Sequence, residues 1–311
     1  MTASRKVISL CLGLCVFLLC VWYIKNKFIW REILEIAMQA DLLWLIGAGA
    51  TSIVLFWFLR TLRWFILLRN LNIRIKFFDL YLCNASSLAL SIITPFQSGE
   101  MIKVELLKNH GMAKRSQGYS SFLVERLFDL YIIITIAIIG ITSYMGLIEN
   151  TYIVVSLLAL LSMIILSSLF LLTKIKMKGK IGTYLFNIKS CVKDRKTFIF
   201  IVILTVLSWI VVGLGWEASL YSISVKLEFQ KTMALMPVVG VISTVSFVPG
   251  ALGVAEVSIA EGLIRLGQST ALAQAGAVIL RGYSVITLFL GIVHFLFWRI
   301  YRIKKERRLW T

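Results

Sequence analysis

Two breaks in long apolar runs carry the residues of this sequence with the most potential for chemistry. Each break has a proline, a glycine four residues later and then a glutamate: Pro95, Gly99 and Glu100 in the first break, and Pro249, Gly253 and Glu256 in the second. Proline and glycine interrupt helices, and interrupted backbone persists in lipid only where protein covers it or where it lines a cavity. We therefore predict that both glutamates gate or exchange protons in a central cavity. The alternative is that each glutamate only caps the helix after its break.

Four more ionisable residues lie inside apolar segments: Glu125, Arg126, Asp129 and Arg281. Charge inside a membrane segment is costly and points to function. The spacing of Arg126 and Asp129 places them on one helix face. Arg126 is predicted to bind a lipid phosphate, unless it forms an internal pair with Asp129 or lies on the cytoplasmic side. Arg281 is expected to pair with Glu256 or Glu261, or to contact a phosphate.

A third group of candidate residues follows the second apolar run. Arg60, Arg63 and Trp64 combine basic and aromatic side chains, a combination that suits anionic headgroups at a membrane interface. We interpret them as an interfacial lipid contact, with an ordinary topology signal as the alternative.

Composition places these residues in a polytopic membrane protein. Hydrophobic residues make up 59% of the 311, against roughly 45–50% in soluble proteins. The net charge of +18 gathers in connectors, which argues against a nucleic-acid partner. The five cysteines have no metal-ligand spacing and the two histidines are far apart, so we expect neither a metal site nor a cofactor.

The apolar runs predict an all-α bundle whose orientation follows from its basic connectors. Lys and Arg mark cytoplasmic loops, and most of the 33 basic residues lie in residues 5–6, 60–77, 101–116, 173–197 and 299–311. Connectors 60–77 and 101–116 therefore share one side, although an apolar stretch separates them. We predict an integral protein of a prokaryotic cytoplasmic (inner) membrane with both termini in the cytoplasm.

This orientation requires two re-entrant helical hairpins. About six full spans are expected, at residues 7–24, 42–59, 118–147, 151–172, 198–223 and 270–298. Residues 78–107 would enter from the cytoplasm and return, and residues 233–266 would do so from outside. With the two hairpins, the two halves would be inverted repeats, the architecture of secondary transporters. The alternative is that residues 78–94 and 233–248 cross fully, giving eight to ten spans. The single membrane domain would comprise an N-terminal span and interfacial helix, a first repeat, a basic loop, a second repeat and a basic tail: 1–41, 42–172, 173–197, 198–298 and 299–311.

Several ordered motifs resemble one known family. They are Arg63-Trp64, Thr94-Pro95 with Gly99-Glu100, Val124 to Asp129, Pro249-Gly250, Leu252-Gly253-Val254, Glu256 and Arg281. Together they resemble the lysylphosphatidylglycerol synthase transmembrane-region family, also described as flippase-like. The resemblance implies a lipid-translocating membrane domain. Bifunctional members carry a soluble aminoacyl-transferase domain after the membrane part, whereas this sequence stops at Thr311, so we expect no lysyl transfer and leave the lipid open.

The leading hypothesis is a flippase that moves an anionic phospholipid or a polyprenyl-phosphate-linked lipid between leaflets. A membrane glycosyltransferase is the alternative, and Glu32, Glu35 and Asp41 are the external carboxylates it would use. An accessory factor in glycolipid or envelope assembly is a third possibility. The expected partners are anionic membrane lipids, with a homo-oligomer or envelope-biosynthesis proteins as further candidates.

Overall fold

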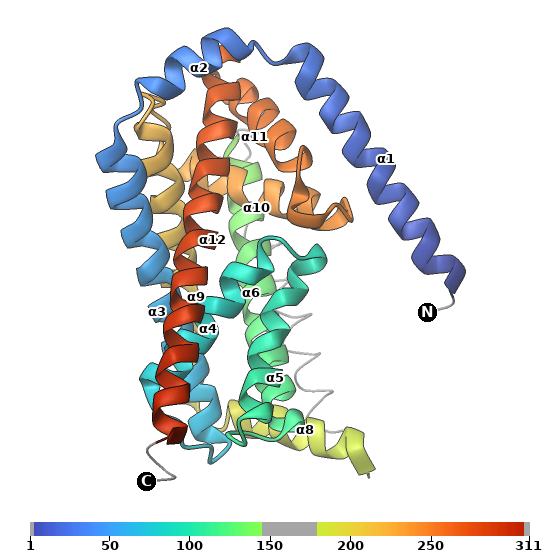
Figure 1. The fold of residues 1–311 in the computed structure, drawn as a ribbon, viewed down its shortest axis with the longest axis vertical. Helices are drawn as coiled ribbons and strands as arrows, with labels where there is room; N and C mark the ends of the chain where they lie inside the picture. The colour runs from blue at the N-terminus through green and yellow to red at the C-terminus, as the bar shows by residue number, and fades with distance from the viewer. Residues whose placement is uncertain (1–2, 145–178, 308–311) are drawn as a thin grey trace. The chain divides into compact units, whose positions relative to one another are not determined.

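The computed structural model describes residues 3–144 and 179–307, and every regular element in these two ranges is helical (Figure 1). In chain order the longer elements are α1 (Ala3–Lys27), α2 (Trp30–Met38), a π-helical turn (Leu43–Ala48) leading into α3 (Gly49–Asn70), α4 (Phe77–Ser91), α5 (Ile102–Asn109), α6 (Arg115–Tyr144), α8 (Gly179–Cys191), α9 (Arg195–Tyr221), α10 (Phe229–Val245), α11 (Val254–Arg265) and α12 (Thr270–Arg307). The all-helical prediction is confirmed for the described residues, and the predicted span Thr151–Leu172 lies outside them.

Among the residues that the structure describes, three helices are long and apolar enough to cross a membrane: Leu43–Asn70, Arg195–Tyr221 and Thr270–Arg302. They coincide with three of the predicted spans, as expected for the roughly 20 apolar residues that a bilayer core requires. Helices Gly13–Lys27 and Trp30–Met38 are long and apolar enough for one span only when taken together, and the chain bends by 83° between them. The span count of six and the inverted repeat stay predictions.

The two predicted breaks are real interruptions of helix. A 3-10 turn at Pro95–Met101 lies between α4 and α5, and a shorter one at Pro249–Ala251 lies between α10 and α11. The first break thus occupies residues 92–101 and the second residues 246–253. The helices on either side of each break pack on one another. The Cys83 thiol of α4 lies 3.7 Å from the Lys103 carbonyl oxygen of α5, and α10 packs on α11.

The chain forms two compact units, each assembled from distant stretches of sequence. Unit 1 comprises Met1–Val54, Ala89–Gly99 and Val211–Leu290, and unit 2 comprises Leu55–Leu88, Glu100–Ile210 and Gly291–Thr311. The first break therefore passes from unit 1 into unit 2 between Gly99 and Glu100.

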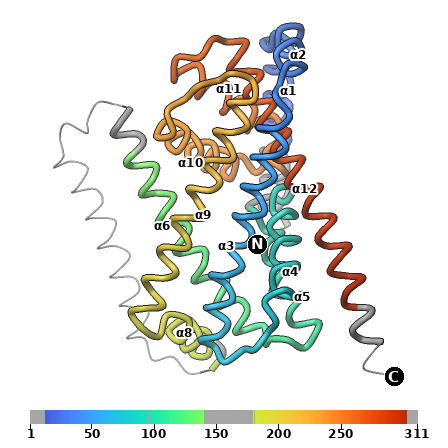
Figure 2. Tube along the Cα trace, turned by 90° about the vertical axis from the view of Figure 1, so that its left-hand side faces the viewer, coloured from blue at the N-terminus to red at the C-terminus, as the bar shows by residue number. Residues whose placement is uncertain are grey.

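Unit 2 is built around an apolar cluster from α3 to α6, α8 and α9, which includes Trp64, Leu68, Leu80, Leu107 and Ile201. Helix α8 lies across the lower end of α6 in both views (Figures 1 and 2), where the Ser120 hydroxyl donates to the Tyr184 carbonyl at 3.2 Å. The end of α3, the start of α4, the end of α5 and the start of α6 reach this same end. The basic connectors 60–77 and 101–116 therefore meet at one end of unit 2.

Unit 1 has its own core, formed mainly by α9 to α12 and including Leu220, Leu235, Ile259, Leu263 and Ala273. Gln274 of α12 stabilises the corner between α1 and α2. Its side-chain amide donates to the Lys27 carbonyl at 3.0 Å and accepts from the Ile29 N–H at 2.9 Å. Backbone groups exposed by the bend at this corner thus find partners, as buried polar groups require.

Close packing inside unit 1 gives a direct test of the fold. A Cβ atom added to Gly215 of α9 would lie 2.2 Å from the Ser52 hydroxyl and 2.7 Å from the Tyr283 hydroxyl, whereas one added to Gly240 of α10 would have no neighbour within 4 Å. We expect Gly215→Ala to lower the free energy of unfolding by about 1–3 kcal/mol through overpacking. Gly240→Ala should cause no loss. Unfolding in detergent measures both, and equal stabilities would contradict this packing.

Candidate functional site

The first break is held together by one threonine. The Thr94 hydroxyl accepts a hydrogen bond from the Gly99 N–H at 2.7 Å and lies 3.2 Å from the Leu90 carbonyl oxygen at the end of α4. A Cβ atom on Gly99 would lie 2.8 Å from the Leu90 backbone, so only glycine allows this close return of the chain. Thr94 and Gly99 together satisfy backbone groups that the end of the helix leaves free.

The second break is held by Arg281 of α12. Its guanidinium donates to the carbonyl oxygens of Gly250 at 3.1 Å and Ala251 at 3.3 Å, and it forms an ion pair with Glu256. Gly253 has φ of +79°, the left-handed region that favours glycine. A Cβ atom on Gly253 would also lie 2.7 Å from Cys20 of α1.

The two breaks lie against each other within unit 1. A Cβ atom built on Gly250 would lie 3.5 Å from the Ile92 carbonyl oxygen and 3.8 Å from the Ile93 Cα. A side-chain carbon on Gly250 would thus touch the backbone of the first break, so the two interrupted segments, 154 residues apart at their prolines, are close neighbours.

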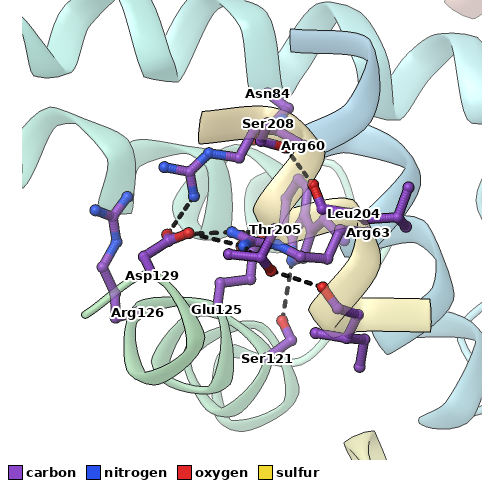
Figure 3. A network of polar contacts seen from close by, with 12 residues as sticks. Arg60, Arg63, Asn84, Ser121, Glu125, Arg126, Asp129, Leu204, Thr205 and Ser208 are labelled. Atoms are coloured by element: carbon purple, nitrogen blue, oxygen red, sulfur yellow. Dashed lines mark hydrogen bonds and ion pairs between the residues drawn. The ribbon is translucent and has the colours of Figure 1, made fainter. Parts of the chain in front are cut away.

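Unit 2 contains a buried network of ion pairs, drawn in part in Figure 3. At its centre Asp129 of α6 accepts from two arginines of α3. Arg63 donates to both carboxylate oxygens, at 2.7 and 3.1 Å, and Arg60 pairs with the same group. Arg63 also donates to the Thr205 hydroxyl of α9 at 2.8 Å. One carboxylate thereby joins α3 to α6, and Arg63 extends the connection to α9.

The other half of the network centres on Lys103 of α5. Its ammonium group lies 2.6 Å from Glu125 Oε2, 2.9 Å from Glu100 Oε1 and 3.2 Å from Asn84 Oδ1. Glu125 Oε1 lies 3.4 Å from Arg63, which links the two halves. Glu100 also pairs with Arg126. Glu100, which lies in the first break, is thus part of the network.

The network holds more positive than negative charge. Ion pairs among the described residues join four cations, Arg60, Arg63, Lys103 and Arg126, to three carboxylates, Glu100, Glu125 and Asp129. Six of the seven side chains are at most 7% exposed, whereas that of Arg126 is 27% exposed. Arg126 is therefore the member most open to the surroundings of unit 2.

Aromatic rings offset part of the excess positive charge. The Lys103 ammonium lies 4.5 Å from the centroid of the Trp64 ring, and the Arg126 guanidinium lies 5.1 Å from that of Phe122. Such contacts contribute about 0.5–2 kcal/mol each. The Nε atoms of Arg60 and Arg63 are buried without a hydrogen-bond acceptor among the described residues. The network is therefore rich in donors as well as in positive charge.

A comparison with known protein families identifies the family of this chain. A model of the family described as "Lysylphosphatidylglycerol synthase TM region" matches residues 10–291. The chain belongs to this family. Membership of the lysylphosphatidylglycerol synthase TM region family confirms the resemblance drawn from the motifs, and with the apolar helices it indicates an integral membrane protein of lipid metabolism or transport. No curated protein matches the chain.

The interfacial position expected for Arg60, Arg63 and Trp64 is wrong in this structure. Their side chains are buried: Arg60 is 5% exposed and the other two 0%. The physical reason is that both arginines find Asp129 across the unit, while the Trp64 indole N–H donates to the Ser121 hydroxyl at 3.0 Å. These residues lie inside unit 2 and form its charged interior.

The other candidates have definite partners. Arg126 pairs with Glu100, while Asp129 takes both α3 arginines, so the internal Arg126–Asp129 pair, given as an alternative to phosphate binding, is not among the ion pairs of the described residues. Arg281 pairs with Glu256, one of the alternatives left open, while Glu261 accepts from the Tyr23 hydroxyl. Both glutamates form ion pairs, Glu100 with Lys103 and Arg126, and Glu256 with Arg281.

Sequence reasoning missed Lys103 and Asn84. A usable signal for Lys103 was its position three residues after Glu100, a spacing that brings side chains together on a helix. Asn84 was visible only as one polar residue in an apolar run. Its amide connects Lys103 to the Thr61 hydroxyl, to which it donates at 3.0 Å.

Two of the three carboxylates considered for the transferase have local structural partners. Glu35 pairs with Arg31 one turn away, and Asp41 accepts from the Leu43 N–H at 2.8 Å. Within residues 3–144 and 179–307, no group of three or more His, Cys, Asp or Glu side chains could hold a metal ion.

The excess of one cation predicts that removing a carboxylate destabilises the protein more than removing a cation does. Asp129→Asn removes a carboxylate and raises the excess to two cations, so we expect a loss of about 3–5 kcal/mol in the free energy of unfolding. Lys103→Met removes the excess and leaves every carboxylate with an arginine, so the loss should be smaller, about 1–3 kcal/mol. Unfolding in detergent with a denaturant measures both.

Arg115→Ala is the matched control, since it removes the cation of the exposed pair with Glu105 and should change stability little. A larger loss for Lys103→Met than for Asp129→Asn would show that the network has no cation in excess.

Proposed function

We propose that the chain translocates an anionic lipid between the leaflets of a membrane and binds the lipid headgroup at the network of unit 2. The observation that carries the proposal is the buried excess of cations in a member of a lipid-related membrane family. A buried charge without a counter-charge is strongly unfavourable. An anionic headgroup supplies the missing negative charge.

The chemistry of the network suits a phosphate. Three of its four cations are arginines, whose planar guanidinium binds phosphate oxygens through two parallel hydrogen bonds. Arg126 is the partly exposed member and forms the entry for the headgroup. The surrounding low dielectric strengthens the attraction relative to water.

Helix geometry supports a site below the membrane surface. Arg60 is ten residues from the end of α3 and Glu125 ten residues from the start of α6, which is about 15 Å along each helix. The basic end of unit 2 would face the cytoplasm, and the headgroup would be bound about half-way into the hydrocarbon core.

The breaks supply the movement in this proposal. Glu100 follows Gly99 directly, so a change of backbone conformation in the first break displaces a carboxylate of the network. The first and second breaks would be the tips of two re-entrant hairpins, and broken helices of this kind provide alternating access in secondary transporters.

The topology can be tested by labelling single cysteines in a variant without the five native ones. We expect Lys108→Cys, at the end of α5, to react only from the cytoplasmic side. Ser269→Cys, after α11, should react only from outside, because each hairpin returns to the side from which it enters. Membrane-impermeant maleimide on cells and on inverted vesicles provides the measurement, and labelling of Lys108→Cys from outside rules out the first hairpin.

Reconstitution in liposomes tests translocation itself. Fluorescent phosphatidylglycerol and a fluorescent polyprenyl-phosphate lipid are offered separately, and exchange between leaflets is followed by quenching from outside. We expect the protein to accelerate exchange of at least one, and Arg126→Gln to slow it about tenfold or more, as loss of a charged hydrogen bond implies.

Arg115→Ala is the control in this assay, because Arg115 is charged and exposed but lies outside the network. Absence of exchange for both lipids with folded wild-type protein, as judged by size-exclusion chromatography, would refute the proposed function.

A further inference from the structure

The charge of the network limits which headgroup it can hold. The ion-paired group has four cations and three carboxylates, and its interior members are almost fully buried. We propose that the site selects headgroups with a single negative charge, that is, phosphodiesters, over zwitterionic headgroups and over phosphomonoester dianions. This inference rests on the proposed function and names the substrate class of the same site.

Selection by charge follows from the cost of leaving a buried charge uncompensated. A headgroup with no net charge leaves one cation in excess, and a dianion leaves one negative charge in excess. A monoanion alone brings the buried group to neutrality. A phosphomonoester carries about −1.5 to −2 at neutral pH because its second pKa is near 6, whereas a phosphodiester keeps a single charge.

The hydrogen-bonding capacity of the network points the same way. The Nε–H groups of Arg60 and Arg63 lack an acceptor among the described residues, and a buried donor without an acceptor costs about 1–3 kcal/mol. Every carboxylate in the network already serves at least two cations. The site therefore needs an acceptor that carries charge, which a phosphodiester oxygen provides.

Two sources of phosphodiester fit this chemistry, a glycerophospholipid and a prenyl lipid bearing a phosphodiester-linked sugar. A prenyl monophosphate does not fit, because it is a dianion at alkaline pH. The charge argument thus separates the lipids left open by the proposed function into phosphodiesters, which fit the site, and phosphomonoesters, which do not.

The test compares headgroups of different charge in phosphatidylcholine vesicles at pH 8. Fluorescent lipids with identical tails carry phosphocholine, phosphoglycerol or phosphate as headgroup, and a fluorescent prenyl phosphodiester sugar forms a separate arm. Wild type should exchange phosphoglycerol at least about tenfold faster than phosphocholine or phosphate, since one uncompensated charge exceeds the 1.36 kcal/mol that a factor of ten represents. Faster exchange of the prenyl lipid than of phosphoglycerol would identify the prenyl source.

Charge variants test the mechanism of the selection. Glu125→Gln raises the excess to two cations and should shift the phosphate-to-phosphoglycerol ratio about tenfold toward phosphate. Lys103→Met removes the excess and should shift the phosphocholine-to-phosphoglycerol ratio about tenfold toward phosphocholine. Each ratio is measured on one preparation, so a loss of folded protein cancels. Glu105→Gln, which changes charge on the exposed side of α5, should shift neither ratio.

The possible outcomes distinguish a failure of this inference from a failure of the proposed function. Exchange of all headgroups at equal rates, or ratios that Glu125→Gln and Lys103→Met leave unchanged, would overturn the charge selection and leave translocation standing. A wild-type preference for phosphate or phosphocholine would overturn it as well. No exchange of any lipid would overturn both proposals.

Discussion

The structure depends on the bonding of two arginines to one buried aspartate. Arg60 and Arg63 lie within an apolar helix, and their charge can remain there only because Asp129 faces them from α6. Breaking a buried pair by removing one partner is strongly unfavourable, although the intact pair contributes little net stability. Such a pair therefore fixes which helices lie together. In unit 2 it fixes α3 against α6, with Thr205 of α9 as a third contact.

The same reasoning explains why the two breaks are built differently. Interrupted helices expose carbonyl and N–H groups that lipid cannot satisfy. In the first break Thr94 satisfies them locally, while in the second break Arg281 reaches across from α12 to two carbonyls. The first break is also tied to the network through Glu100, whereas the second is tied to the long helix α12 through Arg281. This difference gives the two breaks distinct mechanical roles in the proposed transport.

Much of the fold was accessible from the sequence because its signals are local. Apolar runs gave the helices, and the Pro95 and Pro249 motifs gave both interruptions. Glu256 was one of the partners that the sequence offered for Arg281, with Glu261 and a phosphate as the others. The partners of Arg60 and Arg63 were not accessible in this way. A basic pair beside a tryptophan near the end of a span is equally typical of an interfacial anchor and of a buried ion pair. Only Asp129, 66 residues after Arg63, distinguishes these two interpretations. Lys103 was overlooked because a lysine close to a basic connector resembles a topology signal.

The central claim is that the buried excess of positive charge receives a lipid phosphate. An experimental structure of the protein in nanodiscs that contain phosphatidylglycerol tests it most directly. The account predicts a headgroup phosphate within hydrogen-bonding distance of Arg126, with its acyl chains leading away into the lipid. Headgroups resolved only elsewhere on the protein, with the seven-residue network closed and Arg126 bonded to Glu100 alone, would contradict it.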